Sequence, residues 1–161
     1  MATDDDRAMA IEEIRRIILT YPEASDRGEL DRVGEFLGGV LFGEPEKPLE
    51  ELTSRTPEEA SKMYGEAVIY YPDGTSHARH IMTNIDIDVA PDCQSATSRT
   101  TYLVLQATEG LSLRPICTGG YGDTFVRENG AWKLKVRTEW MNLKGDLSHH
   151  VRIPERIHVV G

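Results

Sequence analysis

The spacing of hydrophobic residues changes near residue 67, and this change constrains the fold more than any other feature of the chain. Before it, apolar side chains recur every three or four residues, as one face of an amphipathic helix requires. After it, they alternate with polar residues, which is the pattern of a half-buried strand. Helices followed by a run of strands predict an α+β domain, in which helices pack on one face of an antiparallel sheet.

The first predicted helix begins after a capping box formed by Thr3 and Asp6. Pro22 lacks a backbone N–H and clashes with the preceding turn, so we expect the helix to bend or stop close to Tyr21. The predicted buried face of this helix consists of four residues spaced by three or four positions, namely Ile11, Ile14, Ile18 and Tyr21.

Two shorter helices are expected before the strands begin. One covers residues 30–37, with Asp26 as part of its N-terminal capping signal. Residues 43–54 are rich in Pro and Glu and are expected to form a loop. Thr56 then caps a helix that runs toward Tyr64, with a proline at its first position.

Five strands are predicted in the second part of the chain. Pro72-Asp73-Gly74 marks a turn after the first strand, and Asn129-Gly130 marks a tight hairpin before the last. The strands cover residues 67–71, 77–89, 96–108, 113–127 and 131–142. One domain therefore spans residues 1–148. Residues 149–161 form a C-terminal tail, which is interpreted as a loose tail, a pocket lid or an arm across a subunit contact.

The chain is acidic, with 18 Lys and Arg residues against 27 Asp and Glu residues and a formal net charge of −9. This charge repels phosphate backbones and anionic lipid surfaces, so neither nucleic acid nor a membrane is an expected partner. Cys93 and Cys117 lie in unrelated contexts and predict neither a disulfide nor a zinc site. An acidic N-terminus without a long apolar run predicts a soluble, cytoplasmic protein.

His80 and Asp26 are the residues best suited to acid–base chemistry. In the strand over residues 77–89, alternation places His80, Met82 and Asn84 on one face, which we expect to line the concave interior. A histidine transfers protons near neutral pH when a carboxylate fixes its tautomer, and Asp26 is the expected carboxylate. The pattern brings no ligand set together, so neither a metal nor another cofactor is predicted.

Several short motifs follow one another along nearly the whole chain. They are Tyr21-x4-Asp26-Arg27-Gly28, Asp73-Gly74, His80-x-x-Thr83-Asn84, Gly119-x-Tyr121-x-Asp123 and Gly130-x-Trp132. Their order and spacing resemble the SnoaL-like, scytalone-dehydratase-like family of the nuclear transport factor 2-like superfamily. The resemblance implies a cone-shaped α+β fold, with N-terminal helices packed on a curved antiparallel sheet around an internal pocket. It also implies a small hydrophobic organic molecule as the ligand.

Catalytic members of this family use a buried His–Asp pair to remove a proton from carbon and to expel a group from the neighbouring position. The resemblance implies His80 as the base, Asp26 as its orienter and Tyr21 as a hydrogen-bond donor to a substrate oxygen. The implied function is a cofactor-independent, dehydratase-like lyase or isomerase that acts on a small hydrophobic cyclic molecule, steroid-like or polyketide-like. The expected substrate-binding residues are Met82, Asn84, Tyr121 and Trp140.

One motif departs from the family pattern. Many relatives carry Arg and His inside the Gly-x-Tyr-x-Asp strand, where this chain has Gly120 and Gly122, so a wider pocket or a different substrate is expected. Each proposed catalytic residue also has a structural alternative. In that alternative Asp26 caps a helix, Tyr21 is a core residue and His80 is a hydrogen-bonded structural histidine.

Other functions fit the same fold, because fold alone does not decide function. The alternatives are a non-catalytic ligand-binding or accessory subunit and a polyketide cyclase. The long strands of a half-open cone leave apolar surface exposed, so we expect a homo-oligomer. The resemblance to the dehydratases favours a trimer over a dimer.

Overall fold

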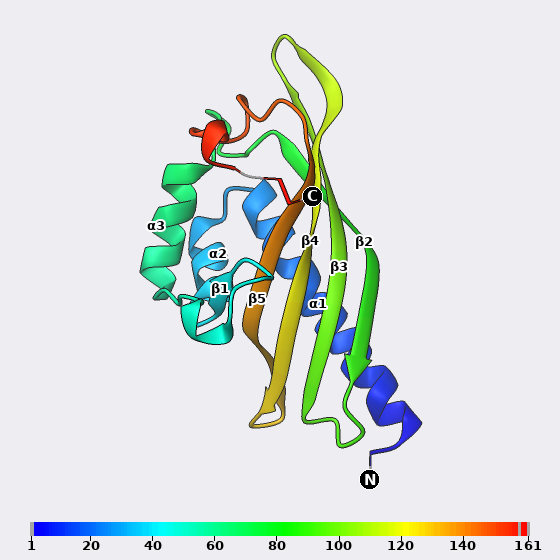
Figure 1. The fold of residues 1–161 in the computed structure, drawn as a ribbon. Coiled ribbons are helices and arrows are strands. Elements are labelled where there is room, and N and C mark those ends of the chain that lie inside the picture. The colour runs from blue at the N-terminus through cyan, green and yellow to red at the C-terminus, as the bar shows by residue number, and fades with distance from the viewer. Residues whose placement is uncertain (1, 158, 161) are drawn as a thin grey trace.

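Three helices pack across one face of a curved, five-stranded sheet (Figure 1). The computed structural model describes residues 2–157 and 159–160. The helices are α1 Asp4–Asp26, α2 Leu30–Leu37 and α3 Pro57–Ala67, with short 3₁₀ helices at Leu49–Glu51 and Pro154–Arg156. The strands are β1 Leu41–Gly43, β2 Ala78–Val89, β3 Ser95–Thr108, β4 Leu111–Glu128 and β5 Ala131–Lys144. This architecture confirms the predicted α+β class.

The sheet is mixed rather than wholly antiparallel as expected. Its strand order is β1-β5-β4-β3-β2, and the four long strands pair in antiparallel fashion. β1 pairs in parallel with β5, with Leu41 opposite Val136 and Gly43 opposite Thr138. The sequence did not predict β1, because a strand of three residues is too short to show an alternating pattern.

The strand predicted over residues 67–71 is wrong. Helix α3 continues to Ala67, and Val68 makes one isolated β-bridge, to Val151. A short apolar run does not distinguish a strand from the end of a helix, which explains the error. The predicted cap at Thr56 is confirmed, since its hydroxyl accepts the backbone N–H of Glu59 at 3.2 Å.

Helix α1 continues through Pro22 and ends at Asp26, so of the two outcomes expected near Tyr21, a bend or a stop, the stop is wrong. Proline removes one hydrogen bond from the turn before it, yet the helix continues to its C-cap, where Arg27 N donates to the Glu23 carbonyl at 3.2 Å. All residues of this last turn except Glu23 are buried, and their packing offsets the lost bond. The additional turn carries Asp26 to the start of β2.

Two β-bulges reverse the faces of long strands. The register of β2 against β3 shifts between Thr83 and Asp86, where Asn84 has φ = 49°. Before this bulge the even-numbered residues of β2 pack into the interior, and after it the odd-numbered residues do. A shift between Thr124 and Phe125 of β4 has the same effect on β5. Strict alternation in a sequence does not reveal such an extra residue.

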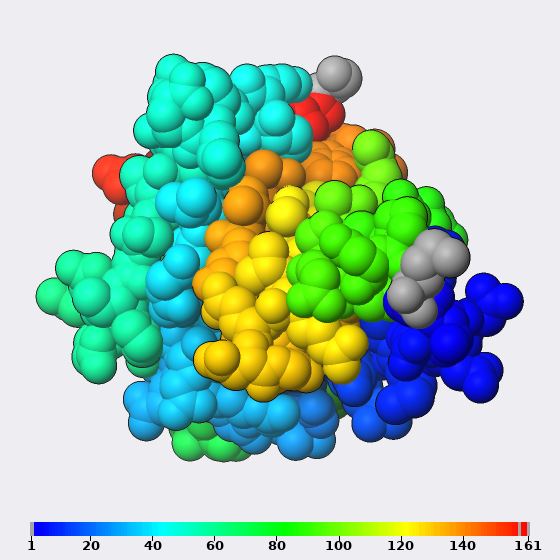
Figure 2. All heavy atoms as spheres, turned by 90° about the horizontal axis from the view of Figure 1, so that it is seen from below, coloured from blue at the N-terminus to red at the C-terminus, as the bar shows by residue number. Residues whose placement is uncertain are grey.

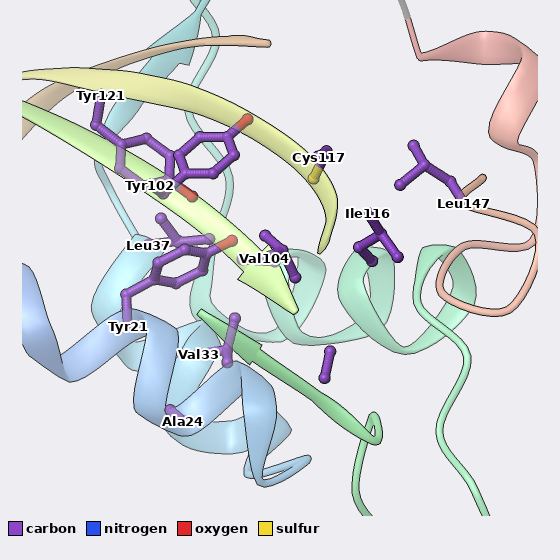
Figure 3. Close-up of a cluster of buried hydrophobic side chains, with 12 residues drawn as sticks. Tyr21, Ala24, Val33, Leu37, Tyr102, Val104, Ile116, Cys117, Tyr121 and Leu147 are labelled. Carbon is purple, nitrogen blue, oxygen red and sulfur yellow. The ribbon is translucent and has the colours of Figure 1, made fainter. Parts of the chain in front are cut away.

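The interior consists of two clusters. The lower cluster packs α1 against the strand ends, near the turns that join β2 to β3 and β4 to β5, which lie side by side in the view from below (Figure 2). The upper cluster is built around Tyr21, Tyr102 and Tyr121 (Figure 3). The buried members of the lower cluster are Ala10, Ile14, Ile18, Val89, Cys93, Ala96, Phe125 and Trp132. The fold therefore has an apolar core at one end and a tyrosine-rich core at the other.

Candidate active site

His80 and Asp26 are in direct contact. His80 Nδ1 lies 2.6 Å from Asp26 Oδ1, and the backbone N–H of His80 donates to Asp26 Oδ2 at 2.8 Å. The side chains are only 9% and 4% exposed, respectively. A carboxylate that receives both N–H groups fixes the proton of the neutral imidazole on Nδ1 and leaves Nε2 as an acceptor. The N-terminus of α2 receives no side-chain hydrogen bond, so the capping role considered for Asp26 is wrong.

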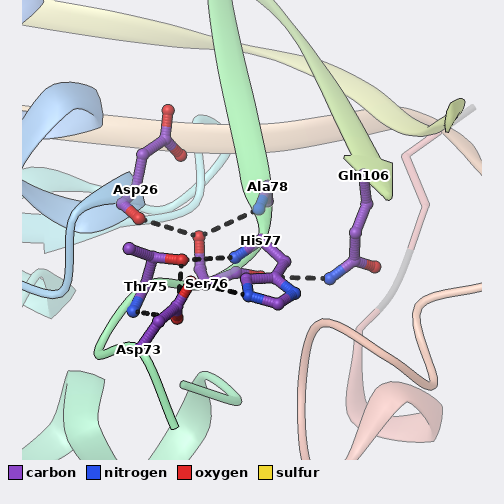
Figure 4. Close-up of polar contacts among 7 residues, drawn as sticks. All are labelled: Asp26, Asp73, Thr75, Ser76, His77, Ala78 and Gln106. Atoms are coloured by element: carbon purple, nitrogen blue, oxygen red, sulfur yellow. Dashed lines mark hydrogen bonds and ion pairs between the residues drawn. The ribbon is translucent and has the colours of Figure 1, made fainter. Parts of the chain in front are cut away.

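Further hydrogen bonds fix the end of α1 against the start of β2 (Figure 4). The Asp26 carbonyl accepts from Ser76 N at 3.2 Å and from Ser76 Oγ at 3.3 Å. Gln106 Nε2, from β3, donates to the carbonyl of Ser76 at 3.3 Å and to that of His149 at 2.9 Å. The His80–Asp26 pair is thus held where α1, β2, β3 and the segment after β5 meet.

Gly28 permits the close packing of the chain beside this pair. It follows α1 with φ = 69°, a conformation that favours glycine. A Cβ atom there would collide with the carbonyl oxygen of Gly74. The absence of a side chain at Gly28 therefore lets the turn after α1 lie against the turn before β2.

A pocket of about 240 Å³ lies beside the pair and includes His80 in its wall. Aromatic and polar side chains in the wall include Tyr21, Tyr102, Tyr121 and Glu139. The apolar part of the wall comes from α3, the sheet and the segment after β5, and includes Met63, Val68, Val104, Met141, Leu147 and Val151. A concave, mostly apolar site with a few polar groups is typical of small-molecule binding.

Tyr21 lies in the pocket wall, held by other side chains. Its ring stacks on Phe36 with centroids 5.6 Å apart and meets Tyr121 edge-on at 6.1 Å. The Arg137 guanidinium lies 5.3 Å from the Tyr21 ring, and Asp123 holds it by two bonds of 2.8 and 2.7 Å. Burial raises the pKa of Tyr21 well above its ordinary value, so the phenol stays protonated and is able to donate.

Two titratable residues that sequence reasoning missed also line the pocket, namely Glu139 of β5 and His150. Glu139 is half-buried, and desolvation raises the pKa of its carboxyl although the charge of Arg137 opposes this shift. His150 is 8% exposed, and its ring centroid lies 6.1 Å from that of His80. Neither residue left a signal in the sequence, because Glu139 faces inward only after the register shift between β4 and β5, and His150 lies in a segment without periodicity.

The sequence model of the SnoaL-like domain matches residues 6–138, which is most of the chain. The chain belongs to the SnoaL-like family. The family predicted from the motifs is therefore confirmed. No curated protein sequence matches this SnoaL-like chain.

Solved structures share the SnoaL-like fold at low sequence identity. A variant of Rv3472 from Mycobacterium tuberculosis, a protein of unknown function, has a TM-score of 0.67 and 17% identity over 89% of this chain and 78% of that chain. A provisionally named scytalone dehydratase from Novosphingobium aromaticivorans has a TM-score of 0.64 and 19% identity, covering 89% and 91%. A provisionally named dehydratase of the NTF2-like family from Streptomyces avermitilis has values of 0.59 and 16%, covering 84% and 98%. These likenesses establish the NTF2-like fold.

Only some of the predicted substrate-binding residues face the SnoaL-like pocket. Tyr121 lines it, and Met82 packs against both core clusters on the same side of the sheet. Asn84 is exposed, because the bulge in β2 turns it away from the interior. Trp140 lies on the outer face under the Arg99 guanidinium, 4.9 Å away, because the shift between β4 and β5 reverses that strand. Contrary to the prediction, neither Asn84 nor Trp140 lines the pocket.

Gly120 and Gly122 also face outward, on either side of the inward-facing Tyr121. A side chain at Gly120 would meet the Trp140 ring, and one at Gly122 would meet the Thr138 hydroxyl. The expectation that these glycines widen the pocket is wrong, because they make room for side chains on the opposite face of the sheet.

Within residues 2–157 and 159–160, no group of three or more His, Cys, Asp or Glu side chains is placed to hold a metal ion. None of the helices in this described part of the chain is long and apolar enough to cross a membrane. Cys93 and Cys117 are both buried and free.

Proposed function

We propose that the chain is a cofactor-independent lyase or isomerase of the dehydratase type, with His80 as its general base. The observation that carries this proposal is the 2.6 Å bond from the buried Asp26 carboxylate to Nδ1 of His80, which lies in the wall of an apolar pocket. Asp26 occupies one ring nitrogen, so the lone pair on Nε2 is the group left for substrate.

The proposed reaction moves one proton through His80. Nε2 takes a proton from a substrate carbon, and the electron pair of that C–H bond forms the new double bond as the neighbouring C–O bond breaks. The departing oxygen takes the proton back from His80 and leaves as water. In an isomerisation the proton returns to a different carbon instead. Asp26 stabilises the imidazolium formed between these steps, and Tyr21 donates a hydrogen bond to the substrate oxygen.

The proposed substrate is a small hydrophobic cyclic molecule that carries oxygen, of the steroid or polyketide type. The aromatic and aliphatic walls of the pocket suit the ring system, and Tyr21 and His80 suit the oxygen and the acidic carbon. A cytoplasmic homo-oligomer, with a trimer preferred, also remains a prediction. Exposed apolar side chains at Ile81, Leu113 and Leu143 favour association, and light scattering at micromolar concentration would measure it.

The test is to screen hydroxylated and ketonic cyclic compounds for water loss or isomerisation and then to compare variants. We expect His80→Ala to lower kcat/KM by about 10²–10⁴-fold, the usual contribution of a positioned general base. Tyr21→Phe should cost less, because it removes one hydrogen bond and keeps the ring. His77→Ala is the matched control, since His77 lies outside the pocket, and it should leave the activity unchanged.

Activity that survives His80→Ala would contradict the assignment of the base. Tight binding of these compounds without turnover would instead support the alternative of a non-catalytic binding subunit.

A further inference from the structure

The segment after β5 forms one side of the pocket and is anchored by backbone hydrogen bonds. In Figure 1 it crosses above α3 at the upper end of the molecule. Ile69 N donates to the His150 carbonyl at 2.8 Å, and Gln106 Nε2 donates to the His149 carbonyl at 2.9 Å. Leu147 and Val151 from this segment line the pocket. The backbone around His150 is therefore fixed, and its side chain has a defined position.

The His150 ring is a buried polar group beside the proposed base. It lies in the pocket wall, its centroid is 6.1 Å from that of His80, and the residue is 8% exposed. Its Nδ1 atom is buried and has no hydrogen-bond partner among the residues that the structure describes. Nδ1 is closed off from the pocket, so Nε2 is the ring nitrogen left for a ligand there.

The charge state of His150 defines the kind of ligand that fits. Burial, and secondarily the proximity of His80, lowers the pKa of His150 to about 4, while the Asp26 carboxylate opposes the shift. The imidazole is therefore neutral near pH 7. A neutral imidazole donates from one nitrogen and accepts at the other, so it pairs with a hydroxyl or a carbonyl oxygen and gives no charge–charge advantage to an anion.

We propose that His150 binds the oxygen substituent of the ligand beside His80, so that the pocket selects ring compounds that carry a hydroxyl or carbonyl over hydrocarbons of the same shape. This inference rests on the proposed function for the identity of the pocket as the reaction site. In the proposed reaction, the oxygen held by His150 is the one that leaves or enolises while His80 takes the proton from carbon. The apolar rings lie against the aliphatic and tyrosine side chains of the wall.

Binding of two matched probes, followed by fluorescence titration, tests the inference without any turnover. The probes are 2-naphthol and 2-methylnaphthalene, which have the same ring and similar size but differ in the oxygen. We expect the native sequence to bind 2-naphthol more tightly by about 3–10-fold, the value of one hydrogen bond. His150→Phe keeps a ring and removes both nitrogens, so its preference for 2-naphthol should fall clearly below the native value. His149→Phe is the control, since its side chain is exposed, and it should keep the preference.

A second measurement covers the case in which His150→Phe does not fold. The ¹⁵N chemical shifts of the His150 ring in the labelled native protein should move on addition of 2-naphthol and stay unchanged with 2-methylnaphthalene. A native protein that binds neither probe, or binds both equally, overturns the inference. So does a His150→Phe variant that keeps the preference. The binding assay involves no turnover, so failure of the proposed catalytic function would be seen separately, in the His80→Ala assay.

Discussion

Two His–Asp pairs lie close together in this molecule and differ in their surroundings. The pair of His80 and Asp26 joins residues 54 positions apart, and its side chains are 9% and 4% exposed. The pair of His77 and Asp73 joins residues four positions apart at 2.9 Å, with side chains 30% and 56% exposed. His77 also stacks on Tyr71, with ring centroids 4.2 Å apart.

The two pairs consist of the same residue types and differ in burial. Burial therefore distinguishes the pair proposed for catalysis from the pair that shapes a turn. Asp73 accepts the backbone N–H of Thr75 at 3.0 Å, and this bond, with the bond to His77, lowers the pKa of Asp73. The exposed pair therefore shapes the turn before β2, and water screens its attraction. The buried pair is shielded from water, and its histidine keeps one nitrogen for the pocket.

The largest expected difference between the two pairs is in catalysis. Asp26→Asn keeps the shape of the side chain but removes the charge that stabilises the imidazolium and can select the wrong tautomer of His80. We expect kcat/KM to fall by about 10²–10³-fold. Asp73→Asn makes the same chemical change in the exposed pair and should leave kcat/KM within about twofold of the native value. The measurement is steady-state kinetics on any substrate that the screen identifies.

Equal losses of kcat/KM in Asp26→Asn and Asp73→Asn would show that the buried and exposed pairs do not differ in catalysis. A native-like Asp26→Asn enzyme would do the same, because it would show that the buried carboxylate acts only in folding.

The sequence predicted the site residues that lie in regular helices and strands, and it missed or misplaced those that lie after a bulge or in a segment without a period. Strand alternation and the family spacing placed His80 and Asp26 together, and the structure has them in contact. Tyr21 and Tyr121 were also correctly expected at the pocket. These residues come from the end of a long amphipathic helix and from regular stretches of strand, where period alone determines the face.

The errors have a common physical origin. Asn84 was placed on the inner face because strict alternation was assumed along β2, and Trp140 was expected in the pocket although the register shift between β4 and β5 turns it outward. A single additional residue reverses every later side chain, and no local pattern marks where it occurs. His150 was missed because the segment after β5 has no period, and only tertiary hydrogen bonds fix its position.

We expect acid to lower the free energy of unfolding through His150, which is buried beside the His80–Asp26 pair. This effect should be smaller than the expected difference in catalysis. His150 has an ordinary pKa of 6.5, lowered to about 4 in the folded protein, so the unfolded chain binds more protons between these values. The stabilising contribution is complete above pH 6.5 and is lost as the pH falls toward 4. Urea unfolding should show a loss of about 2 kcal/mol at pH 5 from this group.

Two variants test whether this acid sensitivity comes from the buried His150 or from the exposed His77–Asp73 pair. His150→Phe should show a flatter dependence of the free energy of unfolding on pH between 6.5 and 4. His77→Ala, which changes the exposed pair, should retain the native slope. A native slope in His150→Phe would mean that another group causes the loss.

The smallest expected effect is the stability of the exposed pair itself. His77→Ala removes a partly exposed hydrogen bond to Asp73 and a ring that stacks on Tyr71, so we expect the free energy of unfolding at pH 7 to fall by less than about 1 kcal/mol. Asp26→Ala provides the contrast in the same urea titration. It leaves the backbone N–H and Nδ1 of His80 without their acceptor in a buried place, which costs about 2–4 kcal/mol. If the two variants lost the same stability, burial would not be what distinguishes the pairs.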